Sequence, residues 1–275
     1  MNYLTAVLLG LVQGITEFLP VSSSGHLSLL QNIFHIEGAD LIFDVLLHVG
    51  TLIPILIVYR RDVRYLRRGL LGLAGMGHDR GRRTPRAREN RRMAVFLVVG
   101  SLPLLLGLAL QSLAERVGAS SVFVGLMLLL TGLALWLSGR YAPAEKPEKN
   151  VSLLDVLLVG LAQALAVLPG LSRSGLTIAA GRLRGFPAKY AVKFSFLLSI
   201  PAVLGAAVLS LIQAVRLGFD TSLLPMYLAG MAAAAVSGYF AIRLLRRVAA
   251  KGGLQSFSYY CWGAGIVSLL LSLVA

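Results

Sequence analysis

Two short polar stretches interrupt an otherwise apolar chain, and both carry residues suited to phosphate chemistry. The first, "EFLPVSSSGH", holds the carboxylate of Glu17, three consecutive serines and the imidazole of His26. The second, "PGLSRSG", places Arg173 between two serines. Serine hydroxyls and free backbone N–H groups ahead of a helix bind anions, and a guanidinium matches phosphate oxygens. The two stretches therefore predict a site for a phosphorylated ligand.

Several side chains near the first stretch could act chemically. Glu17 could bind a divalent cation or take a proton from a nucleophile, and His26 titrates near neutrality as an acid or base. Gln13 lies one helical turn before Glu17 and shares its face. The alternatives are structural: serine and glycine permit close helix packing in membranes, and Glu17 could simply pair with Arg173. Because both stretches are polar breaks at related positions, we favour a functional site.

The elements that must position these residues lie in a membrane. The chain has 275 residues, of which 57% are hydrophobic and only 14% charged, whereas soluble domains carry about 25% charged residues. The sequence predicts no cleaved signal peptide, because the start lacks a basic segment and a small-residue cleavage site. Four runs are long and apolar enough to cross a bilayer, namely Met93–Leu110, Val117–Leu137, Ala191–Ile212 and Leu223–Leu245.

The net charge of +14 is concentrated in segments beside these runs. Residues 60–92 contain twelve arginines against three acidic residues, and a second basic group follows at 243–251. Basic loops next to membrane spans mark the cytoplasmic side and contact anionic lipid headgroups. We therefore predict a polytopic membrane protein that binds membrane lipids and not nucleic acid.

The chain resembles itself at an offset of about 150 residues. "GLVQ" at 10–13 matches "GLAQ" at 160–163, and "SSSG" at 22–25 matches "SRSG" at 172–175. "FDVLLHVG" from Phe43 also resembles "FSFLLSIP" from Phe194. We predict one integral-membrane domain, residues 1–275, built from two repeats at about 1–140 and 151–275.

Proline and glycine interrupt both polar stretches, so we expect the helices to break there. Broken backbone inside a membrane must be buried in protein or line a wet cavity, and paired breaks in two halves indicate a site near the midplane. If each break forms a re-entrant hairpin, each repeat adds three transmembrane helices. The expected spans are 40–60, 93–112, 119–139, 188–213, 222–245 and 254–274.

An odd number of spans in each repeat predicts two inverted-topology repeats in an all-α fold. With residues 60–92 in the cytoplasm, the other basic loops also fall inside and both termini fall outside. The first hairpin then opens outward and the second inward, so their tips meet. Asp44 and His48, one turn apart, add a polar face that either supports the hairpin or acts on a proton or metal. We interpret His35 and His78 as interfacial or loop residues.

With these motifs the chain resembles the undecaprenyl pyrophosphate phosphatase family, the integral-membrane bacitracin-resistance type. "EFLPVSSSGH", "PGLSRSG" and "HVGT" carry the resemblance, which extends over essentially the whole sequence. The family removes the terminal phosphate of undecaprenyl pyrophosphate, which recycles the carrier lipid of peptidoglycan synthesis. The resemblance implies an enzyme of the bacterial cytoplasmic (inner) membrane, with its active site open to the outer face and a polyprenyl pyrophosphate lipid as substrate.

The resemblance also implies roles for individual residues. Catalytic roles fall to Glu17, Ser23, His26 and Arg173, and Glu17 is also the expected ligand of a divalent cation, Mg²⁺ or Ca²⁺. The expected substrate-binding residues are Gln13, Ser22, Ser24, Gly25, Ser172, Ser174, Gly175 and Thr177. Gln13 stands where the family often has a second glutamate, so either Glu17 and the substrate phosphates suffice for the metal or another residue such as Asp44 contributes.

Two mechanisms and two kinds of function stay open from the sequence. Ser23 attacks the terminal phosphorus with Glu17 or His26 as base, or one of these bases activates water and Ser23 only positions the substrate. The alternative function is an inverted-repeat transporter or flippase of a phosphorylated lipid or small anion, since broken helices meeting at the midplane are also a transporter architecture. The oligomeric state is open, with a homodimer as one alternative.

Overall fold

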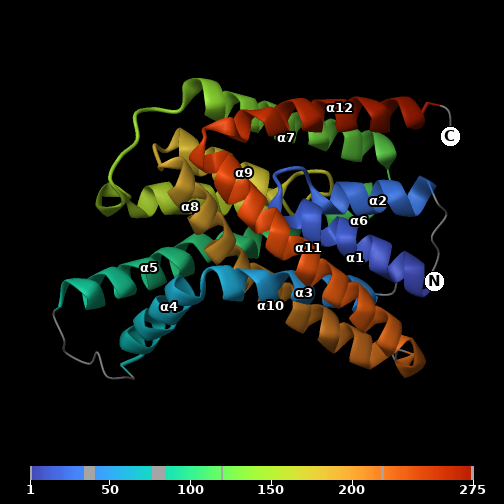
Figure 1. Cartoon of the computed structure of the whole chain (residues 1–275), viewed down its shortest axis with the longest axis horizontal. Coiled ribbons are helices and arrows are strands. Elements are labelled where there is room, and N and C mark those ends of the chain that lie inside the picture. The colour runs from blue at the N-terminus through green and yellow to red at the C-terminus, as the bar shows by residue number, and fades with distance from the viewer. Residues whose placement is uncertain (1, 34–40, 76–83, 119, 218–219, 274–275) are drawn as a thin grey trace.

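A computed structural model describes residues 2–33, 41–75, 84–118, 120–217 and 220–273. Within these ranges the regular structure is entirely helical (Figure 1). The first half contains α1 (Tyr3–Phe18), α2 (Ser23–Ile33), α3 (Leu41–Val58), α4 (Arg60–Leu73), α5 (Pro85–Ser101), α6 (Leu104–Gly118) and α7 (Ser121–Tyr141). The second half contains α8 (Leu153–Leu165), α9 (Arg173–Leu183), α10 (Ala188–Leu217), α11 (Leu224–Ala250) and α12 (Ser256–Leu271). Short 3-10 turns lie at Glu148–Asn150, Thr221–Leu223 and Gly253–Gln255. His35 and His78 lie outside the described residues.

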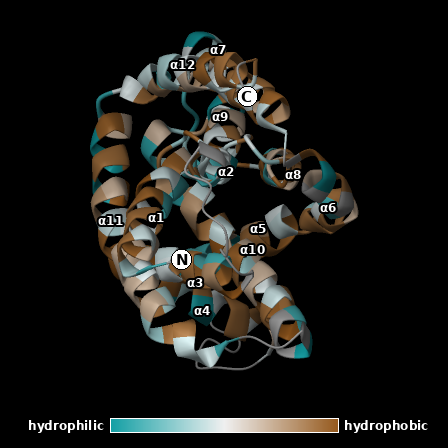
Figure 2. Ribbon diagram, turned by 90° about the vertical axis from the view of Figure 1, so that its right-hand side faces the viewer, coloured by the Kyte–Doolittle hydropathy of each residue, from teal (hydrophilic) through white to brown (hydrophobic). Residues whose placement is uncertain are grey.

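Four helical segments in the described residues are long and apolar enough to cross a membrane, which confirms a multi-pass membrane protein. They are Pro85–Gln111, Ser121–Tyr141, Ala188–Gln213 and Thr221–Ala250, and they correspond to four of the six predicted spans. The predicted span at 40–60 is the first arm of a bent pair, α3 and α4, and the predicted span at 254–274 is the 16-residue α12. Figure 2 shows hydrophobic residues along outer helices such as α6 and α11.

The basic segment at 60–92 is not simply a loop, and that expectation was wrong for its two ends. The chain bends by 95° between α3 and α4, and the first two turns of α5 form from Pro85 onward. The helix α4 is strongly amphipathic: Leu66 and Gly69 are buried while its arginines are exposed. Its buried face packs on α5, so these charges lie along a helical surface at one end of the molecule (Figure 1).

The two halves of the chain pack into each other. The helix α1 packs along α11, and α8 packs along α5. Glycines set both contacts: a Cβ at Gly10 would lie 2.2 Å from the carbonyl oxygen of Gly230, and one at Gly160 would lie 2.2 Å from that of Gly100. Small residues let membrane helices approach this closely. The helices α7 and α12 also lie side by side (Figure 1), with Gly125 against Gly265.

Asp155 stabilises the start of α8 at the basic end of the molecule through hydrogen bonds and ion pairs. Its carboxylate accepts hydrogen bonds from Lys146 Nζ (2.5 Å) and Arg184 Nε (2.8 Å). It also closes a capping box with Ser152. Burial alone would raise the pKa of Asp155, but the hydrogen bonds from Lys146, Ser152 and Arg184 hold it below its usual value. The second hairpin is thus fixed where it begins.

Candidate active site

The first polar tip is the four-residue segment between α1 and α2. The helix α1 ends at Phe18, and Pro20 follows in the connection, as the sequence predicts. Ser22 has a φ of 69°, a left-handed conformation that costs a non-glycine residue roughly 1–2 kcal/mol. Its Oγ accepts a hydrogen bond from the backbone N–H of Gly25 at 3.2 Å. Ser22 therefore turns the chain and caps α2, which sets Ser23 at the first position of that helix.

The second polar tip lies between α8 and α9 and repeats several of these contacts. Gly170 makes the turn with a φ of 91°, where a side chain would be strained. Ser172 Oγ accepts from the N–H of Gly175 at 3.0 Å, and it lies 3.2 Å from Ser174 Oγ. The equivalent hydroxyl pair in the first tip, Ser22 and Ser24, is 3.3 Å apart. Both tips thus present a serine-capped helix N-terminus.

The two tips contact each other, as predicted from the sequence. Ser174 Oγ donates to the carbonyl oxygen of Leu19 at 3.1 Å, and the N–H of Gly170 donates to Ser24 Oγ at 3.5 Å. Arg173 Nη2 forms an ion pair with Glu17 Oε1. A charge from each half therefore meets inside the molecule.

Glu17 is the hub of the paired tips. Glu17 is only 8% exposed. Its oxygen Oε2 accepts hydrogen bonds from Ser23 Oγ at 2.6 Å and from Gln13 Nε2 at 2.9 Å. The short bond to Ser23 is the geometry of a hydroxyl next to a proton acceptor. Arg173 holds the other oxygen, which leaves Oε2 directed at Ser23. This arrangement joins a hydroxyl, a carboxylate and a guanidinium in one contact network.

His26 lies at the first tip but bonds to neither Glu17 nor Ser23 in the described structure. Its Nδ1 donates to the carbonyl oxygen of Ser22 at 2.8 Å. Nε2 of the neutral ring then accepts from the hydroxyl of Tyr260 on α12, 2.7 Å away. The geometry thus favours Glu17 over His26 as the base for Ser23. Sequence reasoning missed Tyr260, because no motif surrounds it and its partner lies 234 residues away.

The other predicted site residues differ in how far they are buried. Ser23 and His26 are half-buried and Ser24 is exposed, so all three side chains are partly accessible. Thr177 is 1% exposed, and its hydroxyl bonds to the Arg173 carbonyl at 2.7 Å and to Ser195 Oγ at 2.7 Å. The remaining serines of the tips, Ser22, Ser172 and Ser174, are buried.

Asp44 and His48 lie one turn apart on α3. His48 Nδ1 donates to the backbone carbonyl of Asp44 at 2.7 Å, which is a contact within one helix. His48 also lies within electrostatic range of the Glu17 carboxylate. It is therefore a neighbour of the network.

The oxygen atoms of the site suit a divalent cation that binds together with a phosphorylated ligand. No group of three or more His, Cys, Asp or Glu side chains with metal-binding geometry occurs in the described residues. Gln13 Oε1 is buried and has no hydrogen-bond partner among the described residues, and the Gln13 side chain contacts Glu17. Mg²⁺ commonly keeps one or two protein carboxylates and takes its remaining oxygens from phosphates and water. The residues present fit that kind of site and not a cage made by the protein alone.

Comparisons with known proteins converge on one family. A family model described as "Bacitracin resistance protein BacA" matches residues 6–267. A protein of Carboxydothermus hydrogenoformans named "Undecaprenyl-diphosphatase" is 42% identical over 275 residues, which covers 98% of each chain. Proteins of the same name from Methanosphaera stadtmanae and Alkaliphilus metalliredigens are each 39% identical. They cover 100% of this chain and 99% and 100% of their own.

Proposed function

The chain belongs to the bacitracin resistance protein BacA family, and on that premise we propose that it hydrolyses undecaprenyl pyrophosphate to undecaprenyl phosphate and inorganic phosphate. Relatives of about the same length carry the name of that activity. A function as a transporter or flippase is not favoured, because a hydroxyl held against a carboxylate exceeds what a binding site needs. The reaction recycles the carrier lipid of peptidoglycan synthesis, consistent with the bacitracin resistance in the family's name.

The hydrogen bond from Ser23 Oγ to Glu17 Oε2, at 2.6 Å, carries the proposed mechanism. Ser23 Oγ attacks the terminal phosphorus while Glu17 takes its proton, and the bond from that phosphorus to the bridging oxygen breaks. Undecaprenyl phosphate leaves, and water then attacks the phosphoserine to release inorganic phosphate and restore Ser23. In the alternative without a covalent intermediate, Glu17 takes its proton from water and Ser23 only orients the substrate.

Arg173 and the tip N–H groups would lower the barrier by neutralising charge on the phosphates. Phosphoryl transfer depends mainly on positioning and on electrostatic stabilisation of the transferring group. In the substrate-free protein Arg173 is held by Glu17, so a pyrophosphate would compete for the same guanidinium. That competition would free Glu17 to accept a proton as the substrate binds.

We also propose that a divalent cation, Mg²⁺ or Ca²⁺, binds together with the pyrophosphate. Glu17 and the unpartnered Oε1 of Gln13 are the oxygens that would hold it. Such a cation would neutralise part of the charge on the pyrophosphate. Gln13 would then ligate through its amide oxygen, which is a weaker contribution than the glutamate expected at this position.

The proposed topology has two inverted repeats, residues 1–140 and 151–275, in one domain. The paired contacts support it: Gly10 packs on Gly230 and Gly160 packs on Gly100, so in each case the hairpin arm of one repeat contacts a span of the other. We propose that the basic end faces the cytoplasm, that both termini lie outside and that the site opens to the outer face. All residues of the proposed site come from one chain, and a homodimer is the alternative to a monomer.

Phosphate release from undecaprenyl pyrophosphate by the detergent-solubilised chain tests the function, because no compartments exist there for transport. Ser23→Ala is expected to abolish the initial burst of undecaprenyl phosphate and to lower the rate of phosphate release at least a hundredfold. Ser101→Ala is its control, because Ser101 Oγ donates only to the carbonyl of Leu97 in its own helix. Rapid quench with labelled substrate should trap phosphate on Ser23. A folded protein that releases no phosphate with either cation across pH would refute the hydrolase.

A further inference from the structure

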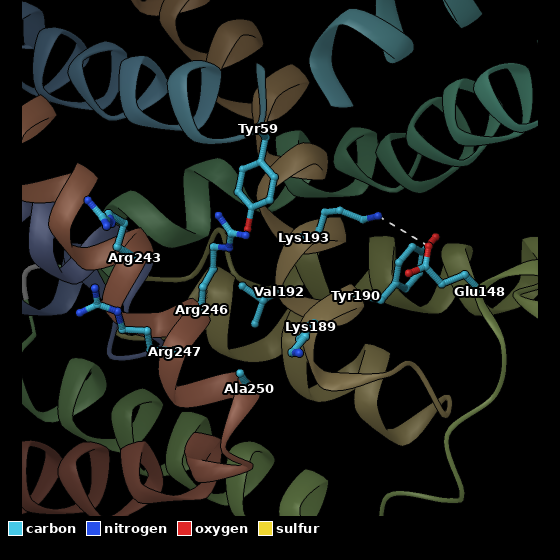
Figure 3. A pocket seen from close by; sticks show the side chains of 10 residues that line it. All are labelled: Tyr59, Glu148, Lys189, Tyr190, Val192, Lys193, Arg243, Arg246, Arg247 and Ala250. Carbon is cyan, nitrogen blue, oxygen red and sulfur yellow. Dashed lines mark ion pairs between the residues drawn. The ribbon is translucent and has the colours of Figure 1, made fainter. Parts of the chain in front are cut away.

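A strongly basic cavity lies at the end of the molecule opposite the start of α1 and the end of α12. It has a volume of about 470 Å³ and lies between α10 and the last turns of α11 (Figure 3). Five basic side chains line it against one carboxylate, that of Glu148. The five are Lys189, Lys193, Arg243, Arg246 and Arg247. Neither Glu17 nor Arg173 belongs to its walls, so the cavity is separate from the candidate active site.

Most of this positive charge is not neutralised within the described structure. Lys193 lies 3.6 Å from Glu148 and 3.9 Å from Asp62. In contrast, none of the ion pairs among the described residues involves the three arginines of the cavity. The contacts that do hold two of them are to aromatic residues: Arg246 lies 5.4 Å from the ring centre of Tyr59, and Arg243 donates to the Tyr239 hydroxyl.

The arginines lie on one face of α11, because residues three and four apart are neighbours on a helix. Like charges at that spacing destabilise a helix. An anion bound between them would relieve this repulsion and accept charge-assisted hydrogen bonds. Arg243, Arg246 and Arg247 are all exposed, so their guanidinium groups can reach such an anion without rearranging the helices. The cavity is therefore built for an anionic group.

An apolar groove continues from the basic cavity along the junction of α1 and α11. Its volume is about 750 Å³, and Arg243 and Arg247 line both spaces. Its other walls are almost entirely hydrophobic: Leu11, Ile15, Leu19, Val236, Ser237, Phe240, Ala241 and Leu244. Val236 is 58% and Phe240 63% exposed. These residues lie on a membrane-spanning segment, where exposed apolar side chains contact hydrocarbon, so a hydrocarbon chain can occupy the groove beside the arginines.

We propose that the cavity and the groove together bind a lipid with a phosphate monoester on a single long hydrocarbon chain. The phosphate lies among the arginines, and the chain follows the groove between α1 and α11. A phosphate monoester carries about two negative charges at neutral pH, which suits five cations and one carboxylate better than the single charge of a phosphodiester. The apolar groove that joins the cavity accommodates a single chain.

The lipid monophosphate released by the proposed reaction belongs to this class, and only that identification rests on the proposed function. The groove begins close to the candidate active site, because Leu19 lines the groove while its carbonyl accepts from Ser174 at the paired tips. A product that left the tips for the groove would then have its headgroup among the arginines of the cavity.

Photoaffinity labelling of the solubilised full chain tests the site. The probe is dodecyl phosphate with a diazirine at the far end of its chain, and the adducts are located by mass spectrometry. We expect adducts in 11–19 and 236–247. The double variant R243Q/R247Q should reduce them about tenfold or more, since each charge-assisted bond contributes roughly a factor of ten. R67Q/R68Q is the control, because these arginines are exposed on α4 and do not line the cavity.

The groove has its own pair of variants. Val236→Trp should fill it and reduce the adducts several-fold, whereas Val122→Trp, at an exposed position of α7, should not. Unlabelled dodecyl phosphate should compete, and inorganic phosphate or dioleoyl phosphatidylglycerol at the same concentration should not. Equal competition by the diacyl lipid or by free phosphate would overturn the proposal. So would adducts confined to the tips, or an equal loss in R67Q/R68Q.

Phosphate release measured on the same samples separates this proposal from the proposed function. R243Q/R247Q should hydrolyse farnesyl pyrophosphate at the rate of the unmodified chain. A protein with no hydrolase activity that still gives arginine-dependent adducts on α1 and α11 would refute the enzyme and support the lipid site. An active protein without those adducts would support the enzyme and refute the lipid site.

Discussion

Glu17→Gln should separate the chemistry of the site from its architecture. The substitution keeps the shape of the side chain but removes its charge and its ability to accept a proton. Glu17 now receives three donors, from Arg173, Ser23 and Gln13. An amide can keep its oxygen toward Arg173 and turn its N–H groups toward the other two. The Gln13 amide can rotate to meet them, because its oxygen has no partner at present.

The structure therefore predicts a small loss of stability and a large loss of rate. Arg173 keeps a hydrogen bond but loses an ionic partner, which costs about 1–3 kcal/mol. The hydroxyl of Ser23 then faces a donor in place of a base, and loss of general-base catalysis lowers rates by about 10²–10⁴. Initial rates of phosphate release, with thermal unfolding of the same samples, measure the two effects separately.

The matched control is Glu89→Gln, an exposed carboxylate on α5 that should leave both quantities unchanged. Because Glu17 and Ser23 act as one unit, the double variant E17Q/S23A should be no slower than the worse single variant. Factors that multiply in the double variant would contradict the pairing. A well-folded E17Q protein with a rate within threefold of the unmodified chain would exclude Glu17 as the base.

Three further perturbations probe the site, the packing and the second hairpin. Arg173→Lys should lower phosphate release at least tenfold, because an ammonium group lacks the planar fork that contacts two oxygens; an unchanged rate would show that charge alone suffices. Gly10→Ala should destabilise the protein by about 1–3 kcal/mol in thermal unfolding. Gly205→Ala, which meets no atom within 4 Å, should be neutral or slightly stabilising; equal effects would contradict the close packing. The pKa of Asp155 is lowered in the folded state, so its stabilisation is complete above its ordinary pKa and is lost as pH falls toward the folded-state value. Asp155→Asn should unfold at a lower temperature near pH 7 and lose less stability than the parent on acidification, which parallel melts at several pH values would measure.

Much of the site could be predicted because its residues carry strong local signals. Proline and glycine at both tips predicted the helix breaks, and the 150-residue repeat with an odd number of spans predicted that the tips meet. The contact of Arg173 with Glu17 follows from those two patterns. The serine clusters were predicted to precede new helices, and they do, but their role as caps of the Gly25 and Gly175 N–H groups was not predicted.

Other features depend on contacts that no local pattern encodes. Tyr260 reaches His26 because α2 and α12 both pack on α7. The left-handed Ser22 replaces the glycine that such a φ normally favours, so its position in the turn was not predictable from residue type. The 95° bend after α3 occurs without proline at the junction, where arginines begin an amphipathic helix along the molecule's basic end.

The pairing of the two tips also sets an order of events during synthesis. Arg173 follows Glu17 by 156 residues, and ribosomes add about 5–20 residues per second. The carboxylate therefore waits roughly 8–30 s for its counter-ion after it has been made. An ionised group cannot be buried in hydrocarbon over that interval at low cost. The first hairpin must consequently stay hydrated, or hold Glu17 protonated, until the second half of the nascent chain has inserted beside it.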